Sequence, residues 1–265
     1  MAIITPAEHA SLPTRRQSQD SLGWRKLFAV VAPSTNTSVQ PEYDAMRPVG
    51  VTNHFGRIAI PDTRVTDDAS FMAMLENIRS ATLAAVDVAM SMEPDDLIMG
   101  MSAETFWDGA EGAERMHRSL RERTGRAVVM GSQAVNEALK AYGGVKRIAV
   151  ITPYMPVGDA QVRRYFEDCG YEVVALEGLK CASPRLIAHV SEAELKRAVE
   201  RGTSADVDAI VQCGTNLAFA RVAAIAEFWL EKPVIAINTA TYWWALRSNG
   251  IADRVQGFGR LLSEF

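Results

Sequence analysis

The sequence is poor in cysteine and histidine, and it carries no strong excess of charge of either sign. Its 265 residues include three cysteines and four histidines, and 28 basic against 32 acidic side chains give a net charge of −4. A mildly acidic chain lacks the basic face that binding to nucleic acid requires. The cysteines have no CxxC spacing and the histidines form no HxH, HxxxH or HExxH pattern, so we expect neither a disulfide framework nor a metal site.

Long apolar runs are also missing. No run approaches the roughly 18 apolar residues that mark a membrane span, and residues 1–25 are polar and lack the apolar core of a secretory signal. We therefore expect no membrane association and a cytoplasmic protein whose thiols stay reduced, with residues 1–25 as an N-terminal arm.

Short apolar runs and segments of helical periodicity alternate from Lys26 onward. The apolar runs predict strands within 27–32, 95–102, 127–132, 147–156, 171–178, 208–216 and 233–238. The periodic segments predict helices at 71–92, 108–123, 133–143, 158–170, 191–202, 219–231 and 239–250. In the fifth of these helices, Ser191 followed by Glu194 predicts a capping box. This alternation is typical of an α/β protein with parallel sheets.

Two pairs of segments resemble each other. Residues 29–33 (AVVAP) resemble 149–153 (AVITP), and 97–102 (LIMGMS) resemble 210–215 (IVQCGT). Chance is one explanation, because apolar strands that end in small residues are common. The other is a chain of two similar halves that face each other across a cleft. Ligands in such sheets bind at the carboxyl ends of strands, where the loops 33–37, 100–105, 153–154 and 213–216 would meet.

The three cysteines differ in their position along the chain. Cys213 follows an apolar strand and precedes a Gly-Thr-Asn loop, where backbone N–H groups and a helix dipole would lower a thiol pKa. We interpret it as a functional group, with a buried small hydrophobe as the alternative. Cys169 near the end of a helix is expected in the core, and Cys181 is expected to pack or to line the cleft.

Other side chains of these loops have both a structural and a functional reading. Tyr154 either covers the core or donates its phenol to a carboxylate, and Ser102 either caps a helix or donates to substrate. Asn36 and the hydroxyls of Ser34 and Thr35 are turn formers or carboxylate donors. We expect a further residue, Glu104, to be solvated or to cap a helix.

Four motifs together resemble a known superfamily. They are VQCGTNL (211–217), PSTNT (33–37), TPY (152–154) and the C-terminal pattern TATYWWALRSNG with GFGRLL. They look like the aspartate/glutamate racemase superfamily, in its branch of maleate cis-trans isomerases, arylmalonate decarboxylases and ectoine-utilisation isomerase-like proteins. The resemblance covers about residues 26–262. It implies an α/β fold of two pseudo-symmetric Rossmann-like halves, 26–135 with 239–265 and 136–238, with the active site between them and no cofactor.

The resemblance also implies roles for individual residues. Racemases and maleate isomerases of this superfamily use two cysteines, one from each half; Cys213 matches the second, whereas Gly100 stands at the first. A single second-half cysteine beside a glycine is the arrangement of arylmalonate decarboxylases, in which the cysteine protonates an enediolate. The resemblance thus assigns catalytic roles to Cys213, Tyr154 and Ser102, and substrate binding to Pro33, Ser34, Thr35, Asn36, Gly100, Met101, Ala103, Gly214, Thr215 and Asn216.

These observations predict a cofactor-independent enzyme that acts at the carbon next to a carboxylate of a small mono- or dicarboxylic acid. Gly100 favours decarboxylation or one-sided proton transfer through one thiol. One alternative is a maleate-type isomerase or a racemase that uses a different second group. Another is a carboxylate-binding protein without catalysis. Trp243 and Trp244, together with the N-terminal arm, are compatible with a homo-oligomer.

Overall fold

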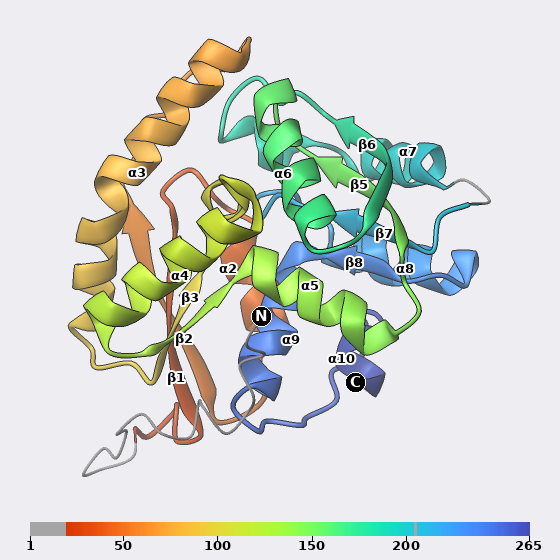
Figure 1. The fold of residues 1–265 in the computed structure, drawn as a ribbon. Helices are drawn as coiled ribbons and strands as arrows, with labels where there is room; N and C mark the ends of the chain where they lie inside the picture. The colour runs from red at the N-terminus through yellow and green to blue at the C-terminus, as the bar shows by residue number, and fades with distance from the viewer. Residues whose placement is uncertain (1–19, 204–205) are drawn as a thin grey trace.

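The chain folds into two parallel sheets of four strands each. A computed structural model describes residues 20–203 and 206–265, so most of the expected N-terminal arm lies outside the described residues. The strand orders are β2-β1-β3-β4 and β6-β5-β7-β8, and every pairing within both sheets is parallel. Figure 1 shows the two sheets on opposite sides of the molecule, each with its own covering helices. The α/β fold expected from the sequence is therefore confirmed.

The described elements alternate between strand and helix along most of the chain. The strands are β1 (Lys26–Pro33), β2 (Val51–Ile58), β3 (Asp96–Met99), β4 (Ala127–Met130), β5 (Arg147–Thr152), β6 (Glu172–Gly178), β7 (Ala209–Gln212) and β8 (Val234–Ala236). The helices are α2 (Val39–Met46), α3 (Asp68–Met90), α4 (Gly109–Thr124), α5 (Gly131–Tyr142), α6 (Pro156–Asp168), α7 (Glu192–Gly202), α8 (Ala220–Leu230), α9 (Ile237–Arg247) and α10 (Arg260–Glu264), with short 3₁₀ turns η1 (Ala103–Phe106) and η2 (Leu186–His189).

The sheet register supports the internal resemblance between the two halves. In the first sheet Ala29 of β1 pairs with Leu97 of β3, and in the second Ala149 of β5 pairs with Ile210 of β7. These are the residues that the two sequence matches place in step. Because both the strand order and the register agree, chance is a poor explanation of the matches, and residues at corresponding positions of the two halves can be compared directly.

Two early elements, α2 and β2, were not predicted from the sequence. The strand β2 forms the edge of its sheet, and two of its side chains, His54 and Arg57, are exposed. An edge strand that is partly open to solvent needs no continuous apolar run, which is the signal that identifies buried parallel strands.

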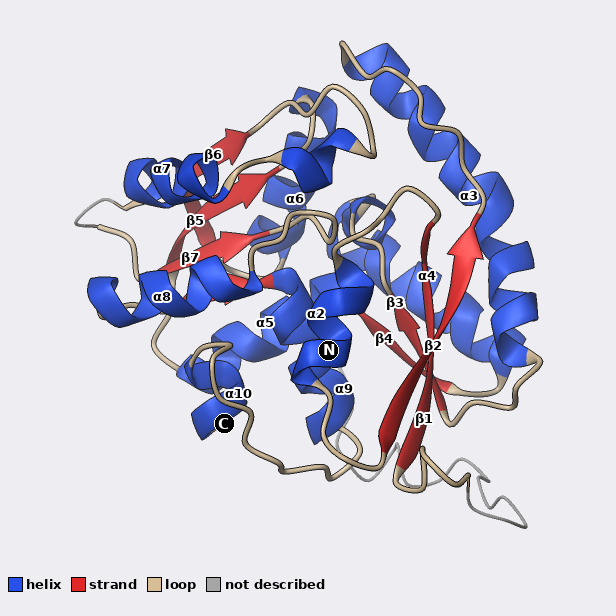
Figure 2. Cartoon of the chain, turned by 180° about the vertical axis from the view of Figure 1, so that it is seen from behind, coloured by secondary structure: helices blue, strands red, loops and turns tan. Residues whose placement is uncertain are grey.

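The two halves are joined by helices that start directly from edge strands. Helix α5 follows β4 without a loop, helix α9 follows β8 in the same way, and the two helices pack against each other. Figure 2 shows α2, α5 and α9 between the two sheets. The expected boundary after residue 135 falls inside α5, so we propose instead that the chain passes into the second half after Tyr142 and returns at α9.

The tryptophans of α9 lie inside the described fold. Trp243 is 5% exposed, its ring packs against Trp244, and its indole N–H donates to the carbonyl oxygen of Phe265. The exposed large apolar side chains include Ile225, Phe228 and Trp229 of α8. The tryptophan pair therefore lends no support to an oligomer, which stays a prediction.

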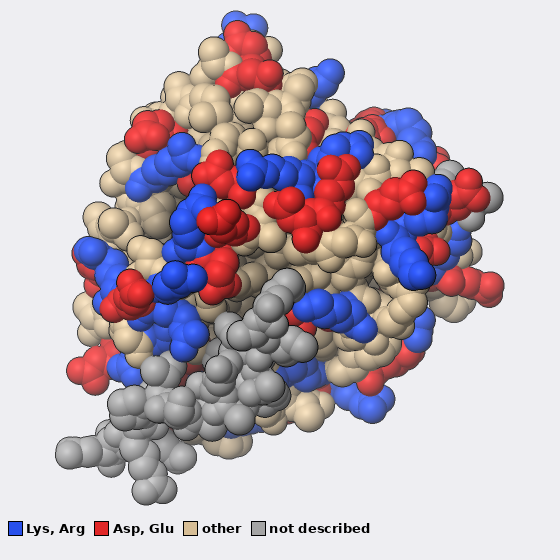
Figure 3. All heavy atoms as spheres, in the orientation of Figure 1, with Lys and Arg blue, Asp and Glu red and all other residues tan. Residues whose placement is uncertain are grey.

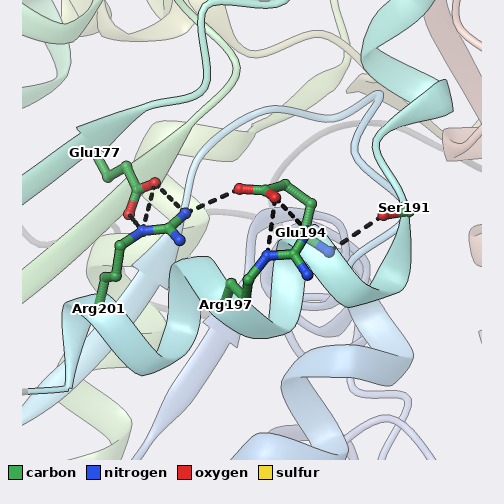
Figure 4. A network of polar contacts seen from close by, with 5 residues as sticks. All are labelled: Glu177, Ser191, Glu194, Arg197 and Arg201. Carbon is green, nitrogen blue, oxygen red and sulfur yellow. Dashed lines mark hydrogen bonds and ion pairs between the residues drawn. The ribbon is translucent and has the colours of Figure 1, made fainter.

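Charged side chains on the surface are mixed and partly paired. Lys and Arg alternate with Asp and Glu over the face shown in Figure 3. At the start of α7, the Ser191 hydroxyl accepts a hydrogen bond from the Glu194 N–H, as expected. The Glu194 carboxylate accepts hydrogen bonds from Arg197 and Arg201. Arg201 also binds the Glu177 carboxylate (Figure 4). The helix is thus capped by Ser191, while the expected return contact from the Glu194 side chain is replaced by ion pairs.

Over the described residues no helix has the length and apolar character to cross a membrane.

Candidate active site

The loops at the carboxyl ends of β1, β3, β5 and β7 meet around one cavity of about 60 Å³. Its lining includes most of the expected site residues: Pro33, Thr35, Asn36, Met101, Ser102, Ala103, Tyr154, Gly214, Thr215 and Asn216. Ser34, Gly100 and Cys213 are not part of the lining. Loops from both halves contribute, so the cavity lies where the two sheets point their carboxyl ends at each other, as the expected cleft required.

Three residues of the cavity wall form a chain of hydrogen bonds across the two halves. The Ser102 hydroxyl accepts the Thr215 N–H at 3.1 Å and lies 2.6 Å from the Tyr154 hydroxyl. One of the two hydroxyl protons forms the hydrogen bond between Ser102 and Tyr154, so the other O–H can be donated into the cavity. The Thr215 N–H, expected to bind substrate, is already used by Ser102. Tyr154 and Ser102 therefore present one neutral donor to a ligand oxygen.

The two asparagines of the site differ in what they leave free. Asn216 uses its whole amide, accepting from the Thr37 and Ser38 N–H groups and donating to the carbonyl oxygens of Thr35 and Pro184. It thereby fastens the loop after β1 to the loop after β7.

The other asparagine, Asn36, keeps a free donor. Its amide oxygen accepts from the N–H groups of Ser38 and Val39, and its amide nitrogen donates one hydrogen to the Thr215 hydroxyl at 3.1 Å. These contacts fix the orientation of the amide, and its second N–H remains available for a ligand.

Cys213 lies directly behind the cavity wall. Its side chain is fully buried, and the next two residues, Gly214 and Thr215, line the cavity. A Cβ at Gly214 would overlap the ring of Pro153, so only glycine allows this close approach of the two loops. Burial raises the pKa of the Cys213 thiol well above its usual value. This direction is opposite to the lowering expected from the loop sequence, because desolvation outweighs any helix dipole at this depth.

Gly100 occupies the position in the first half that Cys213 occupies in the second. The Gly100 N–H donates to the Val31 carbonyl of β1 at 2.8 Å, and the Cys213 N–H donates to the Ile151 carbonyl of β5 at the same distance. This equivalence supports the internal alignment that pairs Gly100 of the first half with Cys213 of the second.

A side chain at position 100 would be crowded. A Cβ on Gly100 would lie 3.0 Å from Val30 Cγ1, 3.1 Å from Ala32 Cβ and 3.2 Å from Val39 Cγ1. Such contacts are tighter than normal packing, so β1 and α2 would have to move apart slightly to hold one. Glycine here thus serves the close packing of β3, whatever its effect on the chemistry.

The remaining expected residues lie outside the cavity wall. Ser34 is exposed, and its hydroxyl exchanges hydrogen bonds with the backbone of Ile60, so it bridges two loops. Cys181 is half-buried, and burial raises its pKa to about 11. Cys169 packs against the core, as expected.

The far side of the cavity is apolar and was missed by the sequence reasoning. Ile60, Met74, Ile78, Pro184 and Ile187 line it, and Met74 and Ile78 come from α3. Their helical spacing on α3 is the pattern of a core-facing stripe, so periodicity alone could not separate cavity lining from core. A site with polar loops on one side and aliphatic side chains on the other suits a small molecule that has a carboxylate end and a carbon skeleton.

Glu104 of η1 also lines the cavity, against the expectation that it is solvated. Its side chain is 11% exposed, and Oε2 accepts from Arg79 Nε at 2.8 Å. Its other oxygen, Oε1, is buried and has no hydrogen-bond partner among the described residues. Burial raises the pKa of Glu104 despite the arginine. Arg79 also stacks on Trp107, which lines a wider hollow of about 510 Å³ on the other side of Glu104.

The cavity lining contains no Lys, Arg or His within the part of the chain that the structure describes. The guanidinium groups stand behind the wall: Arg57 donates to the Asn36 carbonyl oxygen, and Arg79 binds Glu104. Neutral N–H and O–H groups are therefore the donors for a carboxylate at this site. In residues 20–203 and 206–265, no three His, Cys, Asp or Glu side chains gather in a metal-ligating group.

Glu42 of α2 supports the loop after Cys213 from the first half. Its carboxylate accepts from the Ala220 N–H of α8 at 3.0 Å and from the Asn238 amide at 2.6 Å, and Asn238 also donates to the Thr215 carbonyl oxygen at 2.9 Å. Burial raises the pKa of Glu42 to about 7, although these hydrogen bonds oppose the shift.

This raised pKa predicts how stability changes with pH. The folded-state pKa of Glu42 lies above the unfolded value, so its contribution is fully present below about pH 4.5 and is lost as pH rises through about 7. When the pH is raised from 5 to 8, the unfolding free energy of Glu42→Gln should therefore fall by roughly 2–3 kcal/mol less than that of the wild type. Urea denaturation at both pH values measures this, with the exposed Glu122→Gln as control. Equal pH slopes for Glu42→Gln and wild type would show that the carboxyl is not perturbed.

Comparison with known proteins places the chain in an enzyme family. The family model described as arylmalonate decarboxylase matches residues 31–262, so the chain belongs to this family. Its relatives are isomerases and decarboxylases, and the chain is accordingly an enzyme of this cofactor-independent type. The resemblance drawn from the four sequence motifs is confirmed.

Particular relatives cover nearly the whole chain. Maleate isomerase of Alcaligenes faecalis is 25% identical over 248 residues, covering 88% of this chain and 94% of the relative. Among solved structures, a mutant of the maleate cis-trans isomerase of Nocardia farcinica with a covalently bound succinylcysteine intermediate has a TM-score of 0.79 at 22% identity, covering 91% of this chain and 99% of that one. Arylmalonate decarboxylase has a TM-score of 0.68 at 21% identity, with coverage of 89% and 98%. These likenesses establish the fold.

Proposed function

We propose that this enzyme acts at the carbon next to a carboxylate of a small mono- or dicarboxylic acid, through an enediolate-like intermediate, with Cys213 as its proton donor. The observation that carries the proposal is the placement of the buried Cys213 thiol behind a cavity whose wall holds the Tyr154–Ser102 hydroxyl pair. The thiol and the phenol are close enough that a charge on Cys213 would raise the pKa of Tyr154. The proposed acid thus lies behind the same wall that holds the proposed oxyanion donor.

The chemistry follows from this placement. When a malonate-type substrate loses carbon dioxide, the electron pair of the broken C–C bond passes into the remaining carboxylate and forms an enediolate. The O–H of Tyr154 or Ser102, with the free N–H of Asn36, stabilises the negative charge on the enediolate oxygens. The Cys213 thiol gives its proton to the carbon, and the resulting thiolate takes a proton back from water. Because burial raises the thiol pKa, the proton is in place at neutral pH.

Gly100 decides between reaction types under this proposal. Without a side chain it supplies no proton from the first half, which favours decarboxylation or one-sided proton transfer. Cis-trans isomerisation is the second candidate, favoured by the likeness to maleate isomerases and by the succinylcysteine observed in the Nocardia farcinica neighbour. It would require a Cys213 thiolate to add to a double bond and a different second group from the first half. The cavity of about 60 Å³ favours small substrates for either reaction.

A proton NMR time course in D₂O tests the proposal. The probes are methylmalonate, phenylmalonate and maleate. We expect conversion of at least one probe, with deuterium at the protonated carbon if the product forms by decarboxylation, and a Cys181→Ala variant should behave as the wild type does. Tight binding of these acids without conversion or exchange would favour the carboxylate-binding protein instead. We also propose a cytoplasmic location, where the three free thiols stay reduced.

A further inference from the structure

We propose that Glu104 is a second proton-transfer group, which meets the substrate from the first half as Cys213 meets it from the second. This inference rests on the proposed function and deepens it, because it names the group that stands in for the thiol missing at Gly100. It extends the reaction from one-sided protonation to proton transfer on both faces of the α-carbon of a small chiral carboxylate.

The position of the Glu104 carboxylate is the first support. The residue lines the cavity, its side chain is 11% exposed, and Oε1 is buried without a hydrogen-bond partner among the described residues. An unpaired buried carboxylate oxygen is costly and is rarely kept without a partner or a role. Arg79 holds the other oxygen, Oε2, at 2.8 Å, which fixes the carboxylate and leaves Oε1 free to accept a proton.

The relation between the two halves is the second support. Gly100 and Cys213 are equivalent in register, and both lie behind the cavity wall rather than in it. Glu104 follows Gly100 by four residues along the same loop and reaches the cavity from there. Both the Cys213 thiol and the Glu104 carboxylate act electrostatically on the Tyr154 hydroxyl. Glu104 and Tyr154 thus line the cavity from different halves, and the Cys213 thiol lies behind the wall of the second half.

The surroundings of Glu104 suit a general base. Arg79 of α3 is its only cationic hydrogen-bond partner that the structure describes, while Glu76 of α3 and Asp108 before α4 act to raise its pKa, as burial also does. A carboxylate with a raised pKa is a stronger base than an exposed one. Tyr154 lines the cavity and Cys213 lies behind its wall, and both are neutral at neutral pH because burial raises both pKa values.

The step balances with these two groups alone. Oε1 of Glu104 takes the α-proton, and the electron pair of the broken C–H bond passes into the substrate carboxylate to give the enediolate. The Cys213 thiol then gives its proton to the opposite face, which inverts the carbon. Glu104 is left protonated and Cys213 as thiolate, and exchange with water restores both groups. The reverse direction starts from the enzyme with Glu104 protonated and Cys213 as thiolate: the thiolate takes the α-proton, and Glu104 gives its proton to the opposite face.

Deuterium exchange separates the two groups. The probes are the (R) and (S) enantiomers of methylsuccinate and of 2-phenylpropionate in D₂O, followed by proton NMR and chiral chromatography. The wild type should exchange the α-proton of both enantiomers of a probe and interconvert them. Glu104→Gln should interconvert them at least about 100-fold more slowly, and the exchange of one enantiomer that it keeps should require alkaline pH, where the Cys213 thiolate can take the proton. Cys213→Ala should exchange only the other one.

A binding measurement gives a second readout that needs no turnover. If Oε1 faces the cavity, Glu104→Gln removes a negative charge next to a bound dianion, so malonate measured by calorimetry at pH 8 should bind about tenfold more tightly. The matched control is Glu122→Gln, which removes an exposed carboxylate of α4 that lines neither the cavity nor the wider hollow. It should change neither malonate affinity nor exchange.

The outcomes distinguish this inference from the function on which it rests. Two results would contradict a role for Glu104 in proton transfer: exchange of both enantiomers by Glu104→Gln at the wild-type rate, or an unchanged malonate affinity in that variant. Glu104 would then only pair with Arg79 beside the wider hollow, and the proposed function would stand. Failure of the wild type to exchange any of the four probes and to bind malonate would instead contradict the proposed function, and the inference would fall with it.

Discussion

A Cys213→Ala variant is expected to lose turnover of its best malonate or maleate probe by on the order of 10³–10⁴-fold, the upper range for removal of a proton-transfer group. The reason is that the thiol is the acid that delivers the proton to carbon, and among the described residues the second-half side of the cavity wall contributes no carboxylic acid, imidazole or other thiol. Steady-state rates measured by proton NMR give the loss. The fold should survive, since alanine removes a single buried sulfur atom.

The pH dependence of the wild type carries the same argument. An acid is competent below its pKa, and burial raises the pKa of the Cys213 thiol well above its usual value. Activity that depends on this thiol as acid should therefore persist through neutral pH and fall only in alkaline solution. Activity that instead rises with pH through the neutral range would indicate a thiolate nucleophile, provided that the rise is absent in Cys213→Ser.

The matched controls are the other two cysteines. Cys169 packs against the core and Cys181 lies outside the cavity wall, so Cys169→Ala and Cys181→Ala should keep turnover within a few-fold of the wild type. Full activity in Cys213→Ala would remove the thiol from the reaction and contradict its role as the proton donor.

The fold was predictable because its signals are local and repeated. Buried parallel strands such as β1, β5 and β7 appear in the sequence as short apolar runs, and the match between residues 29–33 and 149–153 aligns β1 with β5 from the sequence alone. The edge strand β2 escaped because exposure on one side removes the apolar run. Element type is thus readable from the sequence where both faces of a strand are buried.

The site was only partly predictable, since strand-end position does not fix depth. The loops that form the polar wall follow from parallel topology, which brings Asn36, Ser102, Tyr154 and Thr215 together. Depth depends on packing between the halves, so the sequence suggested a lowered pKa for Cys213 where burial raises it. The same limit concealed Glu104, whose carboxylate looks like a surface group until tertiary packing buries it.

The hydroxyl of Tyr154 is the second group whose removal should have a large effect. Tyr154→Phe is expected to lower turnover by about 10²–10³-fold, as loss of one oxyanion donor does in other enzymes. The phenol belongs to the Ser102 pair at 2.6 Å, and together they supply one O–H to the developing negative charge. The loss should appear mainly in kcat, because the charge that the hydroxyl stabilises develops only in the transition state.

The pairing makes a further expectation for combined variants. Ser102→Ala removes the partner that holds the Tyr154 hydroxyl and accepts the Thr215 N–H, so the double variant Ser102→Ala with Tyr154→Phe should lose less than the product of the two single losses. Tyr142→Phe is the control, since its hydroxyl bonds Glu227 outside the cavity and should affect stability alone. Multiplicative losses would show that the two hydroxyls act on the substrate independently, and an unchanged kcat in Tyr154→Phe would remove the phenol from the oxyanion site.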